Sequence, residues 1–338
     1  MKNKIAIASA FLAASSFSMG EIVVNEFLSF EGFVDSSYST SQSDIEGFKE
    51  SDNSFGVDQV EISWLFNFDA VTAQIDLEYE DGDEDNEDGV EQAFVNLALG
   101  NGDVITAGRY ASMLGFEAYE PTGLYQYSTA YTLDGEVVAS AASQYVQGVK
   151  YTRTTDTTFF GISLQDQAFG NDGDRLGGDS DLDLGQDSSF AVEVAGSIDL
   201  GNGFTVFAGG AFEDAESGDN QLINVYVTYE TGAWLFAAEL NLEENESFFG
   251  VDADSTSALL MANYAYSDVA SVTARISMVD LEVDNDELVE FTKYTVAHNH
   301  ALSDNLLLVT EVSFDDGELF GFADGENLTF AAELLFSF

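Results

Sequence analysis

Carboxylates are the residues of this chain whose chemistry stands out. Aspartate and glutamate number 62, lysine and arginine number 9, and the formal charge of the 338-residue chain is −53. Carboxylates attract cations and repel anions. Nucleic-acid binding needs clustered lysine and arginine, so this composition argues against a nucleic-acid partner. The chain has no cysteine, which excludes disulfide scaffolds and cysteine-ligated zinc or iron–sulfur sites.

Catalytic chemistry has few candidate residues. A nucleophile or a water molecule is usually activated by a histidine base, and His298 and His300 are the only histidines. The sequence also has no Gly-x-Ser-x-Gly motif, the nucleophile elbow of many hydrolases. We therefore expect no enzymatic activity.

Two acidic segments resemble parts of calcium-binding loops. Residues 81–85 read Asp-Gly-Asp-Glu-Asp, but Asn86 stands where an EF-hand loop requires glycine. Residues 170–174 read Gly-Asn-Asp-Gly-Asp and resemble one calcium-binding nonapeptide turn, although such turns are stable only in arrays. We favour solvated loops and no resident cofactor. Weak binding of Ca²⁺ or Mg²⁺ to the acidic loops is the alternative.

The N-terminal segment predicts export. A short basic start precedes an apolar run over residues 5–17, and residues 18–20 (Ser-Met-Gly) are the small residues that a signal peptidase reads. The run is shorter than the ~20 apolar residues that a membrane-spanning helix needs, which argues against an anchor. We expect a signal peptide at 1–20 and a mature domain at 21–338.

The elements that must position the carboxylates are strands. Apolar and polar residues alternate along most of the mature chain, as in strands with one apolar face. In residues 71–80, Ile75 and Leu77 share one face, while Asp76 and Glu78 share the other. The alternation predicts sixteen strands, at 27–39, 56–68, 71–80, 90–99, 103–110, 145–154, 157–165, 188–200, 203–213, 221–230, 233–243, 257–266, 269–280, 288–299, 304–314 and 328–338.

The connections between these strands alternate in length. Every second connection has only two to four residues, whereas the others have seven to 34. Short turns at one rim, long loops at the other and an even number of ~10-residue strands are typical of outer-membrane barrels. We predict an all-β fold, a 16-stranded antiparallel transmembrane β-barrel with short periplasmic turns and long extracellular loops. The long loops are expected at 40–55, 81–89, 111–144, 166–187, 214–220, 244–256, 281–287 and 315–327.

A secreted β-sandwich or a propeller is the alternative all-β fold. Neither has a reason to alternate its loop lengths over sixteen strands, and both turn the apolar face inward. A barrel instead places the apolar face in lipid and the polar face around a lumen, and its closure leaves no unpaired edge.

The end of the chain carries a resemblance. Residues 328–338 alternate up to Phe338, and this ending resembles Gram-negative outer-membrane porins, whose last strand ends in a phenylalanine read during barrel assembly. Residues 108–110 (Gly-Arg-Tyr), 114–117 (Leu-Gly-Phe-Glu) and 127–128 (Tyr-Ser) resemble the OmpL-like family of β-barrel porins. The Pro-Glu-Phe-Gly-Gly stretch of enterobacterial porins is missing, so their constriction residues are not carried over. The resemblance implies a homotrimer in outer-membrane lipid and lipopolysaccharide that passes ions and small hydrophilic solutes by passive diffusion.

The third long connection, 111–144, is the candidate constriction loop. It has 34 residues and carries few charges, and a long loop of modest polarity is expected to pack against protein. The third loop of general porins bends into the barrel, and the resemblance implies the same here, with Glu117 and Glu120 at the constriction. The alternative is a loop packed over the outer rim.

A small set of cations is expected to face this loop. Strand alternation turns Arg109, Lys150 and Arg275 toward the lumen, and we expect Lys293 to point inward as well, although its strand, 288–299, alternates poorly. Opposite Glu117 and Glu120, they would form a transverse field that sorts solutes by charge and dipole. The equally supported alternative is that each cation pairs with a neighbouring lumen carboxylate. These cations are Arg109, Lys150, Arg275 and Lys293.

Many carboxylates fall on the inward parity of the strands. Rings of carboxylates favour cations, so we expect a cation-preferring, water-filled and weakly selective pore. Small or polar inward residues suggest room for water; they are Ser29, Ser63, Ala191, Ala195, Gly209 and Ala211. A substrate-specific channel, or an adhesion anchor that uses the acidic extracellular loops, is the alternative. The inward carboxylates are Glu61, Asp76, Glu78, Glu193, Glu239, Glu311 and Glu333, with Glu31, Asp35, Asp199 and Glu243 beside them.

Overall fold

The computed structural model describes residues 20–80, 89–133, 136–137, 145–169, 188–215, 218–248, 251–284, 286–319 and 323–338. Within these ranges the one helical element is η1, a single 3₁₀ turn at Pro121–Gly123. No helix of this part of the chain has the length and apolar character needed to cross a membrane.

Sixteen long strands and three very short ones make up the rest of the ordered architecture. The short ones are β1 (Ile22–Val23), β7 (Thr132–Leu133) and β8 (Glu136–Val137). The long ones are β2 (Leu28–Ile45), β3 (Phe48–Phe68), β4 (Val71–Glu80), β5 (Gly89–Gly100), β6 (Asp103–Ala111), β9 (Tyr145–Thr154), β10 (Thr158–Gln165), β11 (Ser188–Gly201), β12 (Phe204–Ala215), β13 (Gly218–Thr231), β14 (Trp234–Phe248), β15 (Val251–Ser267), β16 (Ala270–Val283), β17 (Asp286–Ser303), β18 (Leu306–Leu319) and β19 (Ala323–Ser337).

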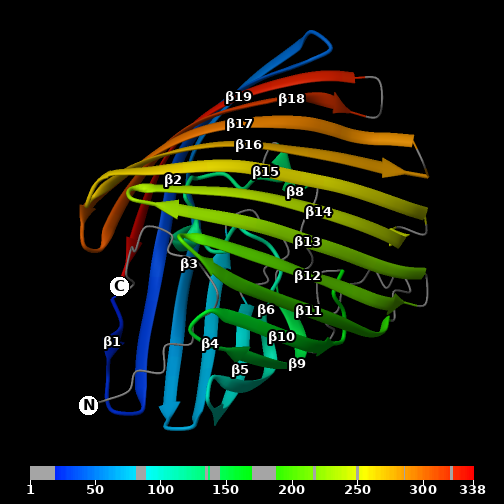
Figure 1. The fold of residues 1–338 in the computed structure, drawn as a ribbon. Helices are drawn as coiled ribbons and strands as arrows, with labels where there is room; N and C mark the ends of the chain where they lie inside the picture. The colour runs from blue at the N-terminus through cyan, green and yellow to red at the C-terminus, as the bar shows by residue number, and fades with distance from the viewer. Residues whose placement is uncertain are drawn as a thin grey trace.

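The sheet closes into a barrel (Figure 1). Each long strand pairs antiparallel with the next, and β19 pairs with β2 to complete the ring. At the seam, the N–H of Phe338 donates to the carbonyl of Gly32, and the N–H of Gly32 donates back to Phe338, both at 2.9 Å. Closure leaves no long strand with a free edge, so the predicted 16-stranded antiparallel barrel is confirmed.

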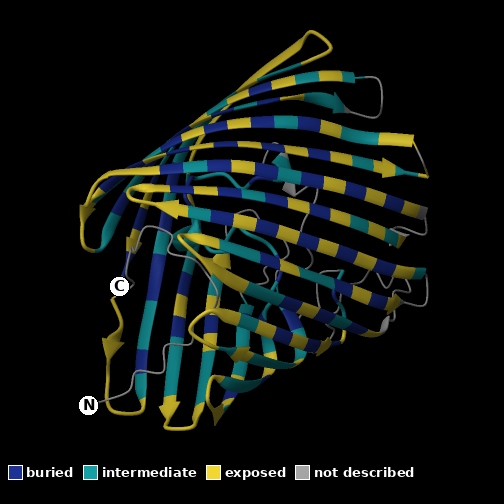
Figure 2. Cartoon of the chain, in the orientation of Figure 1, coloured by how far each residue is buried: buried dark blue, intermediate teal, exposed yellow. Residues whose placement is uncertain are grey.

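Exposed and buried residues alternate along the strands (Figure 2). In β13, Ile223 and Val225 point outward and are 54% and 40% exposed, while Asn220 and Asn224 point inward and are fully buried. Apolar side chains thus form the outer face, whereas the interior carries polar side chains together with apolar ones such as Leu222. The outer face suits hydrocarbon, because it is apolar and because neighbouring strands of the closed sheet satisfy each other's backbone groups.

The predicted short turns are present, although the last lies at 304–305 and not at 300–303, and five of the predicted long loops are wrong. At 40–55, 214–220, 244–256, 281–287 and 315–327, the strands continue through most of the segment. β2 and β3, for example, are separated only by Glu46 and Gly47, whose φ angles of 51° and 82° suit a tight hairpin turn. Backbone pairing persists beyond the alternating apolar segment, as between Thr40 and Asn53. Backbone hydrogen bonds between strands do not require an apolar face, so the alternating hydrophobic pattern ends before the strands do.

Candidate functional site

The described part of the predicted constriction loop lies inside the barrel. We call residues 112–132 the inner loop; it follows β6 and lies within the ring of strands in Figure 1. Of the remainder of 111–144, residues 134–135 and 138–144 fall outside the described residues. The inner loop contacts side chains that point inward from strands on several sides of the barrel, as the following hydrogen bonds show.

Wall carboxylates accept hydrogen bonds from the inner loop. Glu193 accepts from the Met113 N–H at 2.7 Å and from the Ser112 hydroxyl at 2.8 Å. Glu239 accepts from the Phe116 N–H at 2.7 Å and from the Tyr131 hydroxyl at 2.9 Å. These carboxylates satisfy loop N–H groups that no strand partner is available to satisfy.

Wall donors satisfy the carbonyl groups of the same loop. The carbonyl of Tyr125 accepts from the Thr273 hydroxyl and from the Asn299 side-chain amide, both at 3.0 Å. The carbonyl of Ala130 accepts from the Ser277 hydroxyl at 2.7 Å. The loop backbone is therefore bound on both its donor and its acceptor sides.

Arg275 and Glu117 form the central ion pair of this region. The guanidinium Nη1 lies 2.5 Å from Glu117 Oε1, and the Arg275 side chain is fully buried. Arg275 also donates to the carbonyls of Ser128 and Thr129 at 2.9 and 3.0 Å. The sequence left open whether this cation faces a carboxylate across a gap or pairs with one. The geometry is that of a pair.

Glu117 is held by its own loop as well. Its Oε1 accepts from the Gln126 side-chain amide at 2.6 Å, and its Oε2 accepts from the Ala130 N–H at 2.7 Å. A carboxylate with this many donors keeps one orientation. Glu117 thus joins two parts of the inner loop to the β16 wall.

Lys150 and Lys293 point inward, as the alternation predicts. Lys150 donates to the Ala111 carbonyl at 3.1 Å, and its ammonium lies 4.3 Å from the centre of the Tyr110 ring. Lys293 donates to the carbonyl of Thr132 at 3.2 Å. Both ammonium groups lie against the main chain at the two ends of the inner loop.

The predicted lumen orientation of Arg109 is wrong. The neighbouring Tyr110 points inward, because it is 2% exposed and its hydroxyl lies 2.8 Å from the Ser163 hydroxyl. β6 pairs with β5 and β9 without a register shift at Arg109, so its side chain takes the opposite, outward parity. Its Nε donates to the Glu91 carbonyl at 2.8 Å. β6 carries apolar or small residues on both faces, so the sequence alternation does not identify its inner side.

All seven of the predicted lumen carboxylates point inward. Six are at most 5% exposed and Glu78 is half-buried. Of the four others, Asp35 is also buried, Glu31 and Glu243 are half-buried, and Asp199 is exposed beside a short turn. The buried six are Glu61, Asp76, Glu193, Glu239, Glu311 and Glu333.

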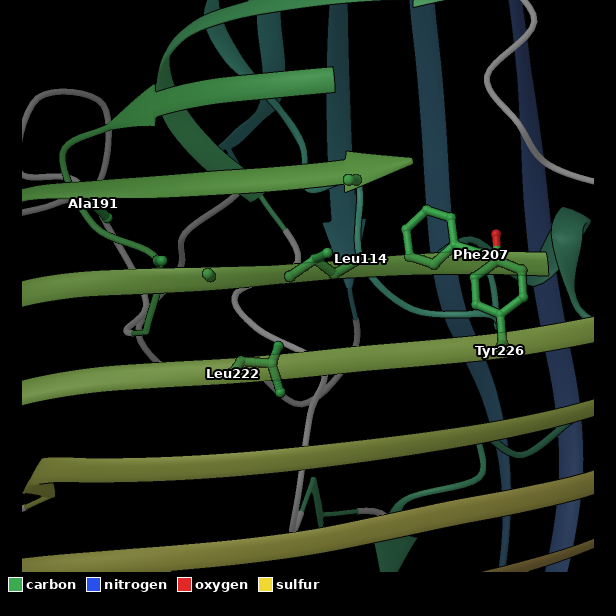
Figure 3. Packing of buried hydrophobic residues seen from close by; sticks show 8 residues of the cluster. Leu114, Ala191, Phe207, Leu222 and Tyr226 are labelled. Carbon is green, nitrogen blue, oxygen red and sulfur yellow. The ribbon is translucent and has the colours of Figure 1, made fainter. Parts of the chain in front are cut away.

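The small inward residues receive the loop rather than leaving open space. Ala191, Ala195 and Ala211 belong to one buried cluster with Leu114, and Leu222 lies in the same cluster (Figure 3). A side-chain carbon on Gly209 would lie 2.5 Å from Leu114. The expectation that these residues leave room for water is therefore wrong at this part of the wall, because apolar loop residues pack against them.

A second group of residues brings Glu120 against the wall. Glu120 accepts from the Tyr145 hydroxyl at 2.6 Å and from the Gln59 amide at 3.2 Å. Burial raises the pKa of Glu120 above its ordinary value. Carboxylate oxygens of Glu61, Glu91 and Glu120 lie within 4.8 Å of one another, the one group among the described residues that could hold a metal ion.

Several residues that bind the inner loop escaped sequence reasoning. Three of them are neutral and lie on the inward parity of long strands: Thr273, Asn299 and Asn224, which accepts from the Gly115 N–H at 3.1 Å. Tyr131 lies in the loop itself. The strand residues could have been selected by a simple signal, which is an amide or hydroxyl side chain at a position that alternation turns away from lipid. Glu91 escaped for a different reason, because a register shift between β4 and β5 occurs beside it.

The remaining predicted residues lie away from the loop. Phe338 forms the seam with Gly32 and its ring lies 6.3 Å from that of Phe30. His298 binds the Tyr266 hydroxyl at 2.7 Å and stacks on that ring. The signal peptide, except Gly20, and the calcium-like segments at 81–85 and 170–174 lie outside the described residues.

Comparison with known sequences gives one family. Residues 28–338 match the model of the family described as putative beta-barrel porin-2, OmpL-like. No curated protein sequence gives a significant match to the chain.

Solved structures of outer-membrane proteins share the fold. OmpT of Vibrio cholerae superposes with a TM-score of 0.63 at 14% identity, covering 94% of this chain and 100% of that one. The anion-selective porin from Comamonas acidovorans gives 0.63 at 15% identity, covering 92% and 99%. OmpF of Salmonella typhi, in complex with daunomycin, gives 0.64 at 14% identity, covering 94% and 100%. At identities this low, the superpositions establish a shared architecture and nothing more specific.

Proposed function

This chain belongs to the OmpL-like family of β-barrel porins, and we propose that it forms a water-filled, cation-preferring channel for ions and small hydrophilic solutes. A barrel of sixteen strands is wide enough to enclose an aqueous passage, whereas eight-stranded barrels are filled by their own side chains. Passage through it is passive diffusion, without an enzymatic step.

The balance of inward charge carries the proposal. Seven predicted carboxylates point inward. The three inward cations, Lys150, Arg275 and Lys293, each donate to the inner loop or to the residue directly before it. Seven carboxylates against three cations leave the inward charge net negative. A lumen of this kind attracts cations and repels anions.

The fold alone does not set the sign of selectivity. The structure described as an anion-selective porin from Comamonas acidovorans has the same architecture. Selectivity must therefore come from the side chains that each chain places in its lumen, which differ at 15% identity.

The inner loop supplies the constriction in this proposal. Glu117 and Glu120 lie on it, and Lys150, Arg275 and Lys293 are the wall cations that bind it or its ends. The buried pairing of Glu117 with Arg275 assigns these two residues to holding the loop in place. Glu120 has no such pairing with Lys or Arg among the described residues, so it contributes negative charge.

Reversal potentials in a KCl gradient test the proposal. Purified protein in a planar bilayer should give a potential of the sign expected for K⁺ permeation. Glu333→Gln, at a buried lumen position, should shift the potential toward zero, whereas Glu244→Gln, at an exposed position, should leave it unchanged. An anion-selective potential in the unmodified protein would overturn the assigned preference.

A substrate-specific channel is the second candidate. The observation that favours it is the number of strands that hold the inner loop. The loop is bound by β11, β14 and β16 as well as by β3 and β9. A loop fixed on so many sides presents one shape to a solute. Conductance that a particular solute blocks at low concentration, while salts pass freely, would favour this candidate. An adhesion anchor acting through the acidic loops would instead show no conductance.

Export and assembly follow from the same proposal. Residues 1–20 direct the chain across the inner membrane, 21–338 form the barrel, and Phe338 is the assembly signal. Lipopolysaccharide and outer-membrane lipid surround a homotrimer, which would appear as three conductance steps of equal size.

A further inference from the structure

Three carboxylates from distant parts of the chain meet inside the barrel. Glu61 comes from β3, Glu91 from β5 and Glu120 from the inner loop, and one oxygen of each lies within 4.8 Å of the other two. Two oxygens that each lie about 2.4 Å from a calcium ion are separated by at most about 4.8 Å. The spacing is therefore that of oxygens able to share one ion.

Two of these carboxylates lack partners on one side. Glu61 and Glu91 are 4% and 7% exposed. The Oε2 atom of each is shielded from solvent and accepts no hydrogen bond from the described residues. Within the described ranges, none of the three forms an ion pair with lysine or arginine. A buried carboxylate without a partner is costly, and binding a cation is one way to offset that cost.

Neighbouring side chains hold two of the carboxylates in fixed orientations. Ser63 donates to Glu61 Oε1 at 2.5 Å, and Tyr145 donates to Glu120 Oε1 at 2.6 Å. Gln59 donates to Glu120 and also to Glu78, which adds a fourth carboxylate nearby. Partners that orient the ligands are typical of metal sites.

The chemistry of the ligands selects the class of cation. All three are carboxylates, and the chain has no cysteine. Hard cations such as Ca²⁺ and Mg²⁺ prefer oxygen, whereas transition metals prefer nitrogen and sulfur. Mg²⁺ demands near-ideal octahedral geometry and retains several waters, while Ca²⁺ accepts irregular sets of carboxylates. A buried site built from three unrelated segments fits Ca²⁺ better.

We propose that Glu61, Glu91 and Glu120 bind one calcium ion, which ties the inner loop to the wall at β3 and β5. None of the three carboxylates belongs to the acidic segments 81–85 and 170–174. The proposed site differs from the Arg275–Glu117 pair, because its carboxylates have no lysine or arginine partner among the described residues. The inference extends beyond conduction, because the ion would bind whether or not solutes pass.

Calcium binding to the full chain tests this proposal. Protein purified in detergent is stripped with EDTA and titrated with CaCl₂ by calorimetry. The chain carries 62 acidic residues, so weak background binding is expected, and the readout is the difference between variants. The unmodified protein should bind one calcium ion that Glu91→Gln binds more than about tenfold more weakly. Glu213→Gln removes a buried carboxylate of β12 that the loop at Ala168 and Phe169 already satisfies, and it should retain the site.

A second probe reports on the same atoms. Tb³⁺ bound at the site should show luminescence sensitised by Tyr145, lost in Glu91→Gln and weakened in Tyr145→Phe. Glu120→Gln replaces Glu91→Gln if that variant does not fold. Equal calcium binding by the unmodified protein and both glutamine variants would overturn the site, and displacement by equimolar Mg²⁺ would overturn its assignment to calcium.

The two proposals fail separately. A calcium site in a protein that shows no conductance would leave this inference standing and remove the proposed channel. Normal cation conductance in a protein without the calcium site would do the reverse.

Discussion

The inner loop is attached to the barrel in two regions of opposite character. On the β16 side, Glu117 meets a buried arginine, Arg275, so positive and negative charges are matched within the protein. On the β3 and β5 side, Glu120 meets Glu61 and Glu91, so three carboxylates lie together. The first attachment pairs opposite charges within the protein, whereas the second groups like charges, for which we propose a calcium ion as the partner.

This difference implies that a buried charged group can either stabilise or destabilise the fold, depending on the charges beside it. A matched pair is costly to break because the remaining member is left without a partner. A set of like charges is costly to keep, because its members repel each other at close range. Removing one charged group should therefore have opposite consequences in the two regions.

The largest effect is expected for Arg275→Met. The variant leaves Glu117 buried without its cation, and breaking a buried pair in this way costs about 3–5 kcal/mol. Urea unfolding of the barrel in lipid vesicles measures the loss. Arg153→Met is the matched control, because Arg153 forms a half-exposed pair with Asp103 at 3.5 Å, and such pairs contribute about 0–1 kcal/mol. Equal losses in the two variants would contradict the special role of the inner pair.

Glu91→Gln should have the opposite sign in metal-free buffer. Like charges about 4 Å apart repel by up to about 4 kcal/mol in a protein environment, so removing one should stabilise the barrel at an alkaline pH at which all three carboxylates are ionised. The same urea measurement, made with EDTA and then with CaCl₂, sharpens the comparison. With calcium present, the variant should become the less stable protein. Destabilisation by this substitution in EDTA would show that the carboxylates do not repel.

A smaller effect is expected where a single neutral hydrogen bond attaches the loop. Thr273→Val removes one of two donors to the Tyr125 carbonyl, and Asn299 still satisfies that oxygen. The expected loss is about 0.5–1.5 kcal/mol. A double variant with Asn299→Leu should lose more than the sum of the two single changes, because the carbonyl is then left without a donor. Additive losses would indicate that water takes the place of the side chains.

The smallest effect is expected outside the inner region, at the β2–β3 hairpin. Lys49 lies 2.9 Å from Asp44 in an exposed ion pair, and Lys49→Ala should leave the urea midpoint unchanged. The Lys49 hydrogen bond lowers the pKa of Asp44 from 3.8. Any contribution of the pair is therefore present above pH 3.8 and is lost as the pH falls through the lower folded value. A urea midpoint that changes in Lys49→Ala at neutral pH would show that this hairpin contributes to the stability of the barrel.

The fold could be predicted because lipid imposes a rule on sequence. A strand that faces hydrocarbon on one side must alternate, and sixteen segments do so. The rule ends where the apolar outer face ends, so the extensions of β2 and β3 were mistaken for a loop. Their serine and threonine residues pair through the backbone, which leaves no periodic signal.

The site could be predicted only in part, for the same reason. Parity identified the inward carboxylates and three cations, but it failed at Arg109, where both faces of β6 are apolar or small. It also failed at Glu91, beside a register shift that changes which residues share a face. Which inward groups meet the loop depends on the path of the inner loop, and no periodicity encodes that path.

The seam between β2 and β19 has a consequence for how the barrel forms. Ser337 pairs with Phe33 and Gly325 with Ile45, so the closing contacts join residues almost a whole chain apart. The other neighbours in the ring are much closer in sequence: most are hairpins, and the longest connection, between β6 and β9, spans residues 112–144. Local contacts form fast, whereas contacts between distant segments carry the entropy of closing the long chain between them and slow the reaction. We therefore expect the curved sheet of hairpins to accumulate first and the joining of β2 to β19 to set the rate of barrel formation.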